Sequence, residues 1–226
     1  MKPLLATLLC LTVLSVAKAQ PSPPAQNSSN LNIQNLVTDC TKSSGQLPHR
    51  EMVIWIPARF WEIVGDQMKI PPETVSVIVK EMAPYMMFCV VDYSVDGAQI
   101  SFKSAADIRS TLKLVDSSKH VYRPLDDKDV SPVALKMIAQ FQPLLAKFLG
   151  QFGDGMRIFM FDGTAGNGKP AFEVDKPNHF LLTWDDASAK WSLPLASVLP
   201  AKHCPVDNEI MPGNWNYCPF HGAKLL

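Results

Sequence analysis

Short apolar runs, bounded by turn residues, dominate the hydrophobic pattern between residues 50 and 200. The runs are EMVIWIP, MMFCVVDYSV, AQISF, STLKLVD, HVYRPL, MRIFMFDG, HFLLTW and WSLPLASVLP. Runs of this length predict β-strands. Asp96-Gly97 and Ser117-Ser118-Lys119 each separate two runs and predict hairpins, and residues 185–188 predict a loop between the last two strands.

Two segments follow a helical spacing instead. PPETVSVIVKEMAPY opens with two prolines, and its apolar residues recur every three or four positions. Ser131-Pro132 supplies a helix cap and a first-turn proline for a helix over residues 131–149, which Pro143 should kink and Gly150 should end. The order strand, helix, four strands, helix, three strands lacks the regular alternation of a parallel sheet. It predicts a mainly β fold over residues 49–200, an antiparallel immunoglobulin-like β-sandwich with inserted helices.

The first 48 residues have the pattern of an export signal followed by a tether. Met1-Lys2 precedes an apolar run of about 14 residues, and residues 17–19 read Ala-Lys-Ala, which predicts a signal peptide over residues 1–19. Residues 20–48 are rich in proline, asparagine and serine, which predicts a disordered tether. We therefore expect a secreted or periplasmic protein with no transmembrane segment after signal cleavage.

The charge balance and one loop motif argue against two classes of function, nucleic-acid binding and nucleotide binding. Signal removal would leave 19 basic against 21 acidic residues, so the chain lacks the basic excess of a nucleic-acid binder. Gly163, Gly168 and Lys169 match the start of a phosphate-binding loop, but Pro170 stands where the magnesium-binding hydroxyl belongs. This departure argues against nucleotide binding.

Candidate catalytic groups are sparse. Acidic residues cluster in two expected loops, at Asp126, Asp127 and Asp129, and at Asp185 and Asp186. Histidines at positions 49, 120 and 179 lie near loops and strand ends and are expected to be surface residues. Cys89 lies in an apolar run typical of a core position, and whether it pairs with Cys40 is left open.

The C-terminal residues repeat a motif. CPVDNEI at 204–210 and CPFHGAKL at 218–225 align as Cys-Pro-x-(Asp/His)-(Asn/Gly). The second copy resembles the Cys-Pro-x-Cys-Gly-x-x-Leu knuckle of zinc-ribbon proteins, with His221 in place of the second cysteine, and the first copy resembles a second knuckle with Asp207 in that place. The residue after each such position must adopt a left-handed conformation, which glycine and asparagine accept.

Two interpretations of the C-terminal module at 201–226 stay open. In the first, Cys204, Asp207, Cys218 and His221 bind a structural zinc ion, as the resemblance implies. In the second, Cys204 and Cys218 form a disulfide, which an oxidising compartment permits. The sequence as a whole predicts an exported, non-enzymatic binding or scaffolding protein. Its expected partner is an unidentified protein or a component of the envelope. The alternative is a secreted or periplasmic metal-dependent hydrolase that uses the acidic loop residues.

Overall fold

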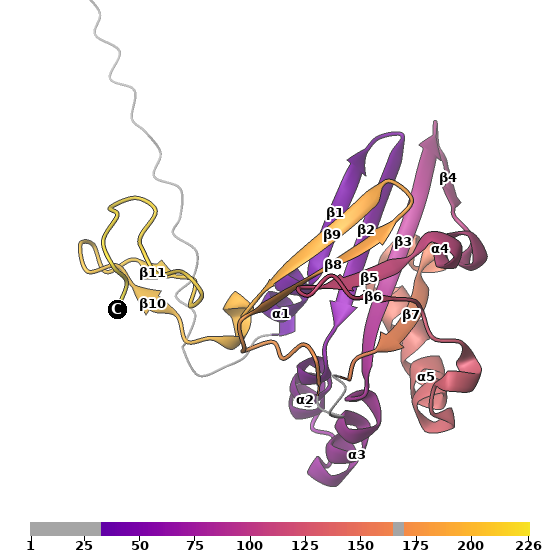
Figure 1. Cartoon of the computed structure of the whole chain (residues 1–226), viewed down its shortest axis with the longest axis horizontal. Helices are drawn as coiled ribbons and strands as arrows, with labels where there is room; N and C mark the ends of the chain where they lie inside the picture. The colour runs from indigo at the N-terminus through magenta and orange to yellow at the C-terminus, as the bar shows by residue number, and fades with distance from the viewer. Residues whose placement is uncertain (1–32, 165–169) are drawn as a thin grey trace, which may run out of the picture.

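Two antiparallel sheets form the body of the protein, which is described from a computed structural model covering residues 33–164 and 170–226 (Figure 1). The first sheet has the order β1-β2-β3-β4. Its fifth strand, β7, pairs with the first half of β3. Its strands are β1 (Thr41–Gln46), β2 (His49–Ile56), β3 (Tyr85–Asp96), β4 (Gln99–Phe102) and β7 (Arg157–Asp162). The second sheet has the order β6-β5-β8-β9. Its strands are β5 (Lys113–Asp116), β6 (Val121–Tyr122), β8 (Asn178–Trp184) and β9 (Ala187–Leu193).

Aromatic side chains join the two sheets. Trp55 of β2 lies 4.9 Å from Phe180 of β8, and Phe88 of β3 lies 5.7 Å from Trp191 of β9, measured between ring centroids. All four rings are almost completely buried. The second sheet buries only one of its faces. Buried and exposed residues accordingly alternate along the whole of β9. The coarse prediction of a mainly antiparallel β fold with inserted helices is confirmed, whereas the immunoglobulin-like arrangement is not.

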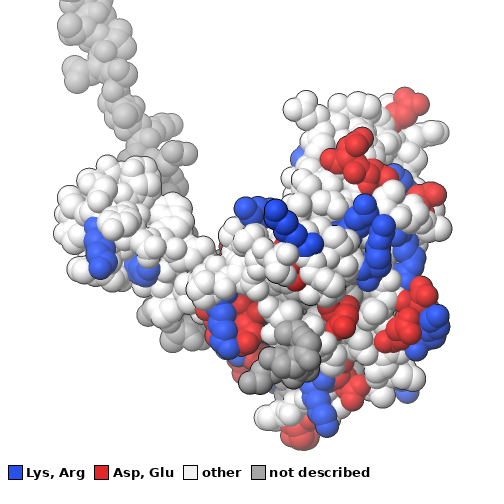
Figure 2. All heavy atoms as spheres, in the orientation of Figure 1, with Lys and Arg blue, Asp and Glu red and all other residues white. Residues whose placement is uncertain are grey.

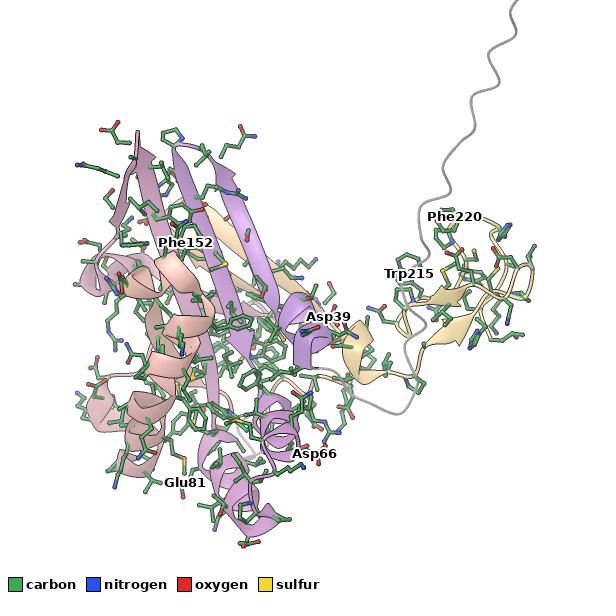
Figure 3. All side chains as sticks on the ribbon, turned by 180° about the vertical axis from the view of Figure 1, so that it is seen from behind. Asp39, Asp66, Glu81, Phe152, Trp215 and Phe220 are labelled. Atoms are coloured by element: carbon green, nitrogen blue, oxygen red, sulfur yellow. The ribbon has the colours of Figure 1, made fainter. Side chains whose placement is uncertain are left out.

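Helices cover the first sheet on the side away from the second sheet. The helix α5 (Pro132–Phe148) lies across that face, and α2 (Ala58–Gln67) and α3 (Pro72–Met82) lie together at one end of the sheets (Figures 1 and 3). Trp61 of α2 contacts Phe141 of α5, with 4.7 Å between ring centroids. Because both of its faces are covered, β3 is buried at every residue from Met86 to Asp92.

Local signals predicted α3, α5 and the first hairpin. Ser131 caps α5 by accepting hydrogen bonds from the backbone N–H groups of Val133 and Ala134. In the hairpin, Asp96 pairs with Gln99, and Gly97 takes a φ of 58°. The predicted hairpin around residues 117–119 is also present, between β5 and β6.

The predicted tether over residues 20–48 needs correction. Residues 33–46 form the helix α1 (Ile33–Cys40) and the strand β1, and residues 20–32 lie outside the described part of the chain. The physical reason is burial, since Leu36 and Cys40 are at most 1% exposed, and Trp191 donates a hydrogen bond to the Cys40 carbonyl. The predicted signal peptide at 1–19 also lies outside the described residues.

The structure differs from the sequence-based expectation in three smaller ways. The helices α2 and α4 (Ala105–Thr111) were not predicted. The turn between β8 and β9 is shorter than expected, because Trp184 pairs with Ala187 and leaves only Asp185 and Asp186 between them. Three short 3-10 segments, η1 (Asp127–Asp129), η2 (Gly150–Gly155) and η3 (Ala196–Val198), connect longer elements.

Residues 201–226 have a hydrophobic cluster of their own. Its buried members are Cys204, Met211, Cys218 and Leu225, and they are separate from the main core. The strands β10 (Lys202–His203) and β11 (Ile210–Met211) form a two-stranded ribbon in this module, which stands beside the sheets after η3 (Figure 1). Within the described residues, no helix has both the length and the hydropathy needed to cross a membrane.

Candidate metal centre

The two Cys-Pro segments of the module fold into matching turns. The backbone N–H of Asn208 donates to the carbonyl of Cys204 at 2.9 Å, and the N–H of Gly222 donates to that of Cys218 at 2.8 Å. Each turn is closed in the same way, because Cys204 N–H bonds the carbonyl of Glu209 and Cys218 N–H bonds that of Ala223. The repeat in sequence is therefore a repeat in structure.

The left-handed residue predicted after each ligand position is present in both turns. Asn208 has a φ of 60° and Gly222 a φ of 65°. The absence of a β-carbon makes this conformation easy for glycine, and asparagine tolerates it better than most residues. The prediction of a left-handed residue at each of these two positions is thus confirmed.

Each turn directs backbone N–H groups at a sulfur atom. The N–H groups of Val206 and Asp207 hydrogen-bond Cys204, and those of Phe220 and His221 hydrogen-bond Cys218. Such bonds stabilise a thiolate. Burial outweighs them at Cys204 and raises the pKa of its thiol above the ordinary value.

The pKa of the Cys218 thiol shifts in the opposite direction, below the ordinary value. Burial opposes ionisation there too, but the N–H groups of His221 and Phe220, with the His221 side chain and the Cys204 thiol, outweigh it and lower the pKa of Cys218. The hydrogen bond between the two sulfurs raises the pKa of Cys204 and lowers that of Cys218. A metal ion that binds both sulfurs must displace any proton that they carry.

His221 completes a cluster of three ligand atoms. Its Nδ1 lies 3.4 Å from Cys204 Sγ and 3.5 Å from Cys218 Sγ, and the three atoms all lie within 4.8 Å of one another. Zinc bonds of about 2.3 Å to sulfur and 2.0–2.1 Å to nitrogen, at a tetrahedral angle, place the two ligand atoms roughly 3.6 Å apart. Both sulfur–nitrogen distances already match that edge, and both thiols are free.

Asp207, the fourth predicted ligand, lies at the border of this cluster. Its Oδ2 is 3.8 Å from His221 Nδ1, and its Oδ1 accepts a hydrogen bond of 3.0 Å from the backbone N–H of Glu209. That bond, followed by a hydrogen bond from the Cys204 thiol and the charge of His221, lowers the pKa of Asp207. The structure therefore brings three of the four predicted residues together and places an ionised carboxylate beside them.

Exposure differs across the centre. Both sulfur atoms belong to buried residues, whereas the His221 side chain is 35% exposed and that of Asp207 is 39% exposed. A metal ion bound here would be closed off on the sulfur side and reachable from solvent on the side of the imidazole and carboxylate.

The acidic loops do not form a comparable site. Asp126 forms an ion pair with Arg109 at 2.7 Å, and Asp185 pairs with Lys103. In the described ranges, residues 33–164 and 170–226, the C-terminal cluster is the sole group of three or more His, Cys, Asp or Glu side chains whose ligand atoms all lie close enough together to hold a metal ion. The glycine-rich match at Gly168 and Lys169 lies outside those ranges.

Cys40 and Cys89 are not part of a metal centre. Both are free and buried, and the open question of their pairing is answered by two separate thiols. Burial raises the pKa of Cys89 to about 12, and burial with the nearby charge of Asp39 raises that of Cys40 further. Both residues pack in the core.

One polar cluster was missed from the sequence. His49, expected to be a lone surface histidine, places its Nε2 3.0 Å from Glu51 and 3.5 Å from Asp92. A signal was available, because His49 and Glu51 are two apart on one strand and Asp92 and Ser94 are two apart on the next. The sequence does not predict the register between the two strands, which is what brings these four residues together.

Searches with the whole chain against protein-family profiles, curated proteins and solved structures found no match.

Proposed function

We propose that residues 201–226 form a zinc-binding module in which Cys204, Cys218 and His221 are ligands and Asp207 supplies the fourth. One observation carries this proposal: the imidazole nitrogen lies at the distance of a tetrahedral zinc edge from both sulfur atoms. Two thiolates and an imidazole favour zinc over magnesium or calcium, which prefer oxygen ligands.

The small core of the module supports a structural role for the metal. Two of its four buried side chains are the cysteines themselves. Only Met211 and Leu225 are left as buried apolar side chains that are not proposed ligands. So little apolar area cannot offset the conformational entropy of about 26 ordered residues. A bound metal ion supplies the missing stabilisation in small domains of this kind.

We further propose that the module serves an exported protein as a binding unit for a protein of the envelope or extracellular space. Large apolar and aromatic side chains are exposed around its turns, namely Val206, Trp215, Tyr217 and Phe220, of which Phe220 is 74% exposed (Figure 3). Val206 and Phe220 occupy equivalent positions of the two knuckles, directly after Cys-Pro. The face of the module seen in Figure 2 has few charged side chains, which suits an apolar contact.

Metal content tests the proposed centre. Protein purified under reducing conditions at neutral pH is expected to contain about one zinc per chain, and His221→Ala is expected to lose most of it. The matched control is His203→Ala, because His203 lies on β10 of the same module but outside the cluster. Elemental analysis of the three proteins measures the result.

Two outcomes contradict the proposal. One is an equal zinc content in the parent and His221→Ala. The other is a metal-free parent whose intact mass, recorded without reductant, shows a Cys204–Cys218 disulfide. The second outcome would favour the alternative that the sequence left open, since a sulfur in a disulfide is no longer a thiolate ligand.

A further inference from the structure

The inner face of the first sheet changes from apolar to polar where the second sheet ends. Along this face, β2 carries Trp55, Val53, Glu51 and His49 in turn, and β3 carries Phe88, Val90, Asp92 and Ser94. Side chains two apart on a strand share a face, and directly paired residues of an antiparallel sheet share it too. The register pairs Glu51 with Asp92 and His49 with Ser94, so four polar side chains meet beside the last residues of β8.

The hydrogen bonds of this cluster fix the tautomer of His49. Its Nε2 lies 3.0 Å from Glu51 Oε1 and 3.5 Å from Asp92 Oδ1, and its Nδ1 lies 3.0 Å from Ser94 Oγ. An ionised carboxylate only accepts hydrogen bonds, so Nε2 must carry the proton. In a neutral imidazole Nδ1 is then an acceptor, and the Ser94 hydroxyl donates to it.

Both carboxylates are buried and held in place. Asp92 is 2% exposed and Glu51 is 8% exposed. The indole N–H of Trp184 donates to Asp92 Oδ2 at 3.1 Å, and the Ser44 hydroxyl donates to Glu51 Oε2 at 3.2 Å. Carboxylates beside an imidazole stabilise the imidazolium that forms when the ring takes up a proton. His49 is the group between them, and it becomes positive when it takes a proton from Ser94.

We propose that Ser94 and His49 form a nucleophile and general base for acyl transfer from esters, with Glu51 and Asp92 as positioning residues. As the Ser94 oxygen bonds to the carbonyl carbon of an ester, its proton passes to His49 Nδ1. The bond to the leaving alcohol then breaks, and the alcohol takes that proton. Water attacks the acyl-Ser94 in the same way, which releases a carboxylic acid and restores the hydroxyl.

Access and role distinguish this site from the metal centre. The His49 side chain is 48% exposed and Ser94 is partly exposed, so an ester can approach both residues from solvent. The site lies in the sheets rather than in the C-terminal module, and it goes beyond the binding function proposed there. It also departs from the sequence-based expectation of a non-enzymatic protein.

Diisopropyl fluorophosphate provides the test. Attack by Ser94 forms an oxygen–phosphorus bond, fluoride leaves, and the proton goes to His49. Peptide mass mapping of the full protein should place the adduct on Ser94, with no adduct at that peptide in Ser94→Ala. Ser101→Ala is the matched control, because Ser101 is the cross-strand partner of Ser94 on β4 and is itself exposed; it should be labelled at the parent rate.

Substitution of His49 decides whether the serine is activated. His49→Gln keeps a polar side chain but cannot take a proton, so labelling of Ser94 should slow by at least about 100-fold. With p-nitrophenyl acetate, Glu51→Gln should lower kcat and leave KM unchanged, because Glu51 touches the base and not the ester. Circular dichroism confirms that each variant is folded.

Three outcomes would overturn the proposal. They are equal labelling of Ser94 and Ser101, no labelling of Ser94, and an unchanged labelling rate of Ser94 in folded His49→Gln.

Discussion

Removing the metal is expected to unfold residues 201–226 while the two sheets stay folded. The module buries only four side chains, and two of them are the proposed ligands Cys204 and Cys218. The main core is a separate cluster that contains none of the ligands. Because the metal would contribute most of the free energy of folding of the module, chelation should abolish its structure rather than weaken it.

Limited proteolysis measures this effect. A strong zinc chelator should expose cleavage sites after residue 200 within minutes and leave a stable fragment that contains both sheets. His221→Ala should behave like the chelated parent without added chelator, and His203→Ala should behave like the untreated parent. A module that resists protease equally with and without chelator would show that its fold does not depend on a metal.

Trp191→Ala is expected to destabilise the body of the protein by roughly 3–5 kcal/mol, the cost of emptying a large aromatic site in a core. Trp191 is 1% exposed and contacts Trp55 and Phe88 of the opposite sheet as well as Phe180 of its own. Its removal leaves a cavity at the junction of the two sheets. For a protein of this size, the melting temperature should fall by roughly 6–20 °C.

Two further variants separate the packing of Trp191 from its hydrogen bond. Trp191→Phe keeps an aromatic ring but loses the N–H that donates to the Cys40 carbonyl at 3.1 Å, so it should cost about 1–3 kcal/mol. Trp215→Ala, in the C-terminal module, removes an indole that is 41% exposed and should change the main transition by about 0.5 kcal/mol or less. Thermal or urea unfolding followed by circular dichroism measures all three. A Trp191→Ala transition within about 1 kcal/mol of the parent would contradict the packing of the sheets described above.

Features set by neighbouring residues were predictable from the sequence. The helix α3 begins with Pro72 at its first position, and α5 begins with Ser131 as its cap. The hairpin at Gly97 and the left-handed residues Asn208 and Gly222 depend on the conformational preferences of single residues. For the same reason, the repeated Cys-Pro motif predicted the turns that bring Cys204, Cys218 and His221 together.

Features set by distant contacts were not predictable. The helix α2 has no side-chain cap at its start, and it is held by burial of Phe60, Trp61 and Ile63. The segment of β1, TKSSGQ, is polar in sequence and is ordered by its pairing with β2. The cluster around His49 needs the register between β2 and β3, which joins positions 45 residues apart. Periodicity reports which residues face a core, but it does not report which strands meet.

X-ray absorption at the zinc edge of the purified protein tests the central claim most directly. We predict two sulfur neighbours at about 2.3 Å and at least one nitrogen neighbour at about 2.0–2.1 Å, with oxygen completing the set. Cys218→Ser should reduce the sulfur count to one, and His203→Ala should leave the spectrum unchanged. A protein without zinc, or zinc surrounded by oxygen and nitrogen alone, would contradict the proposal that Cys204, Cys218 and His221 form a metal centre.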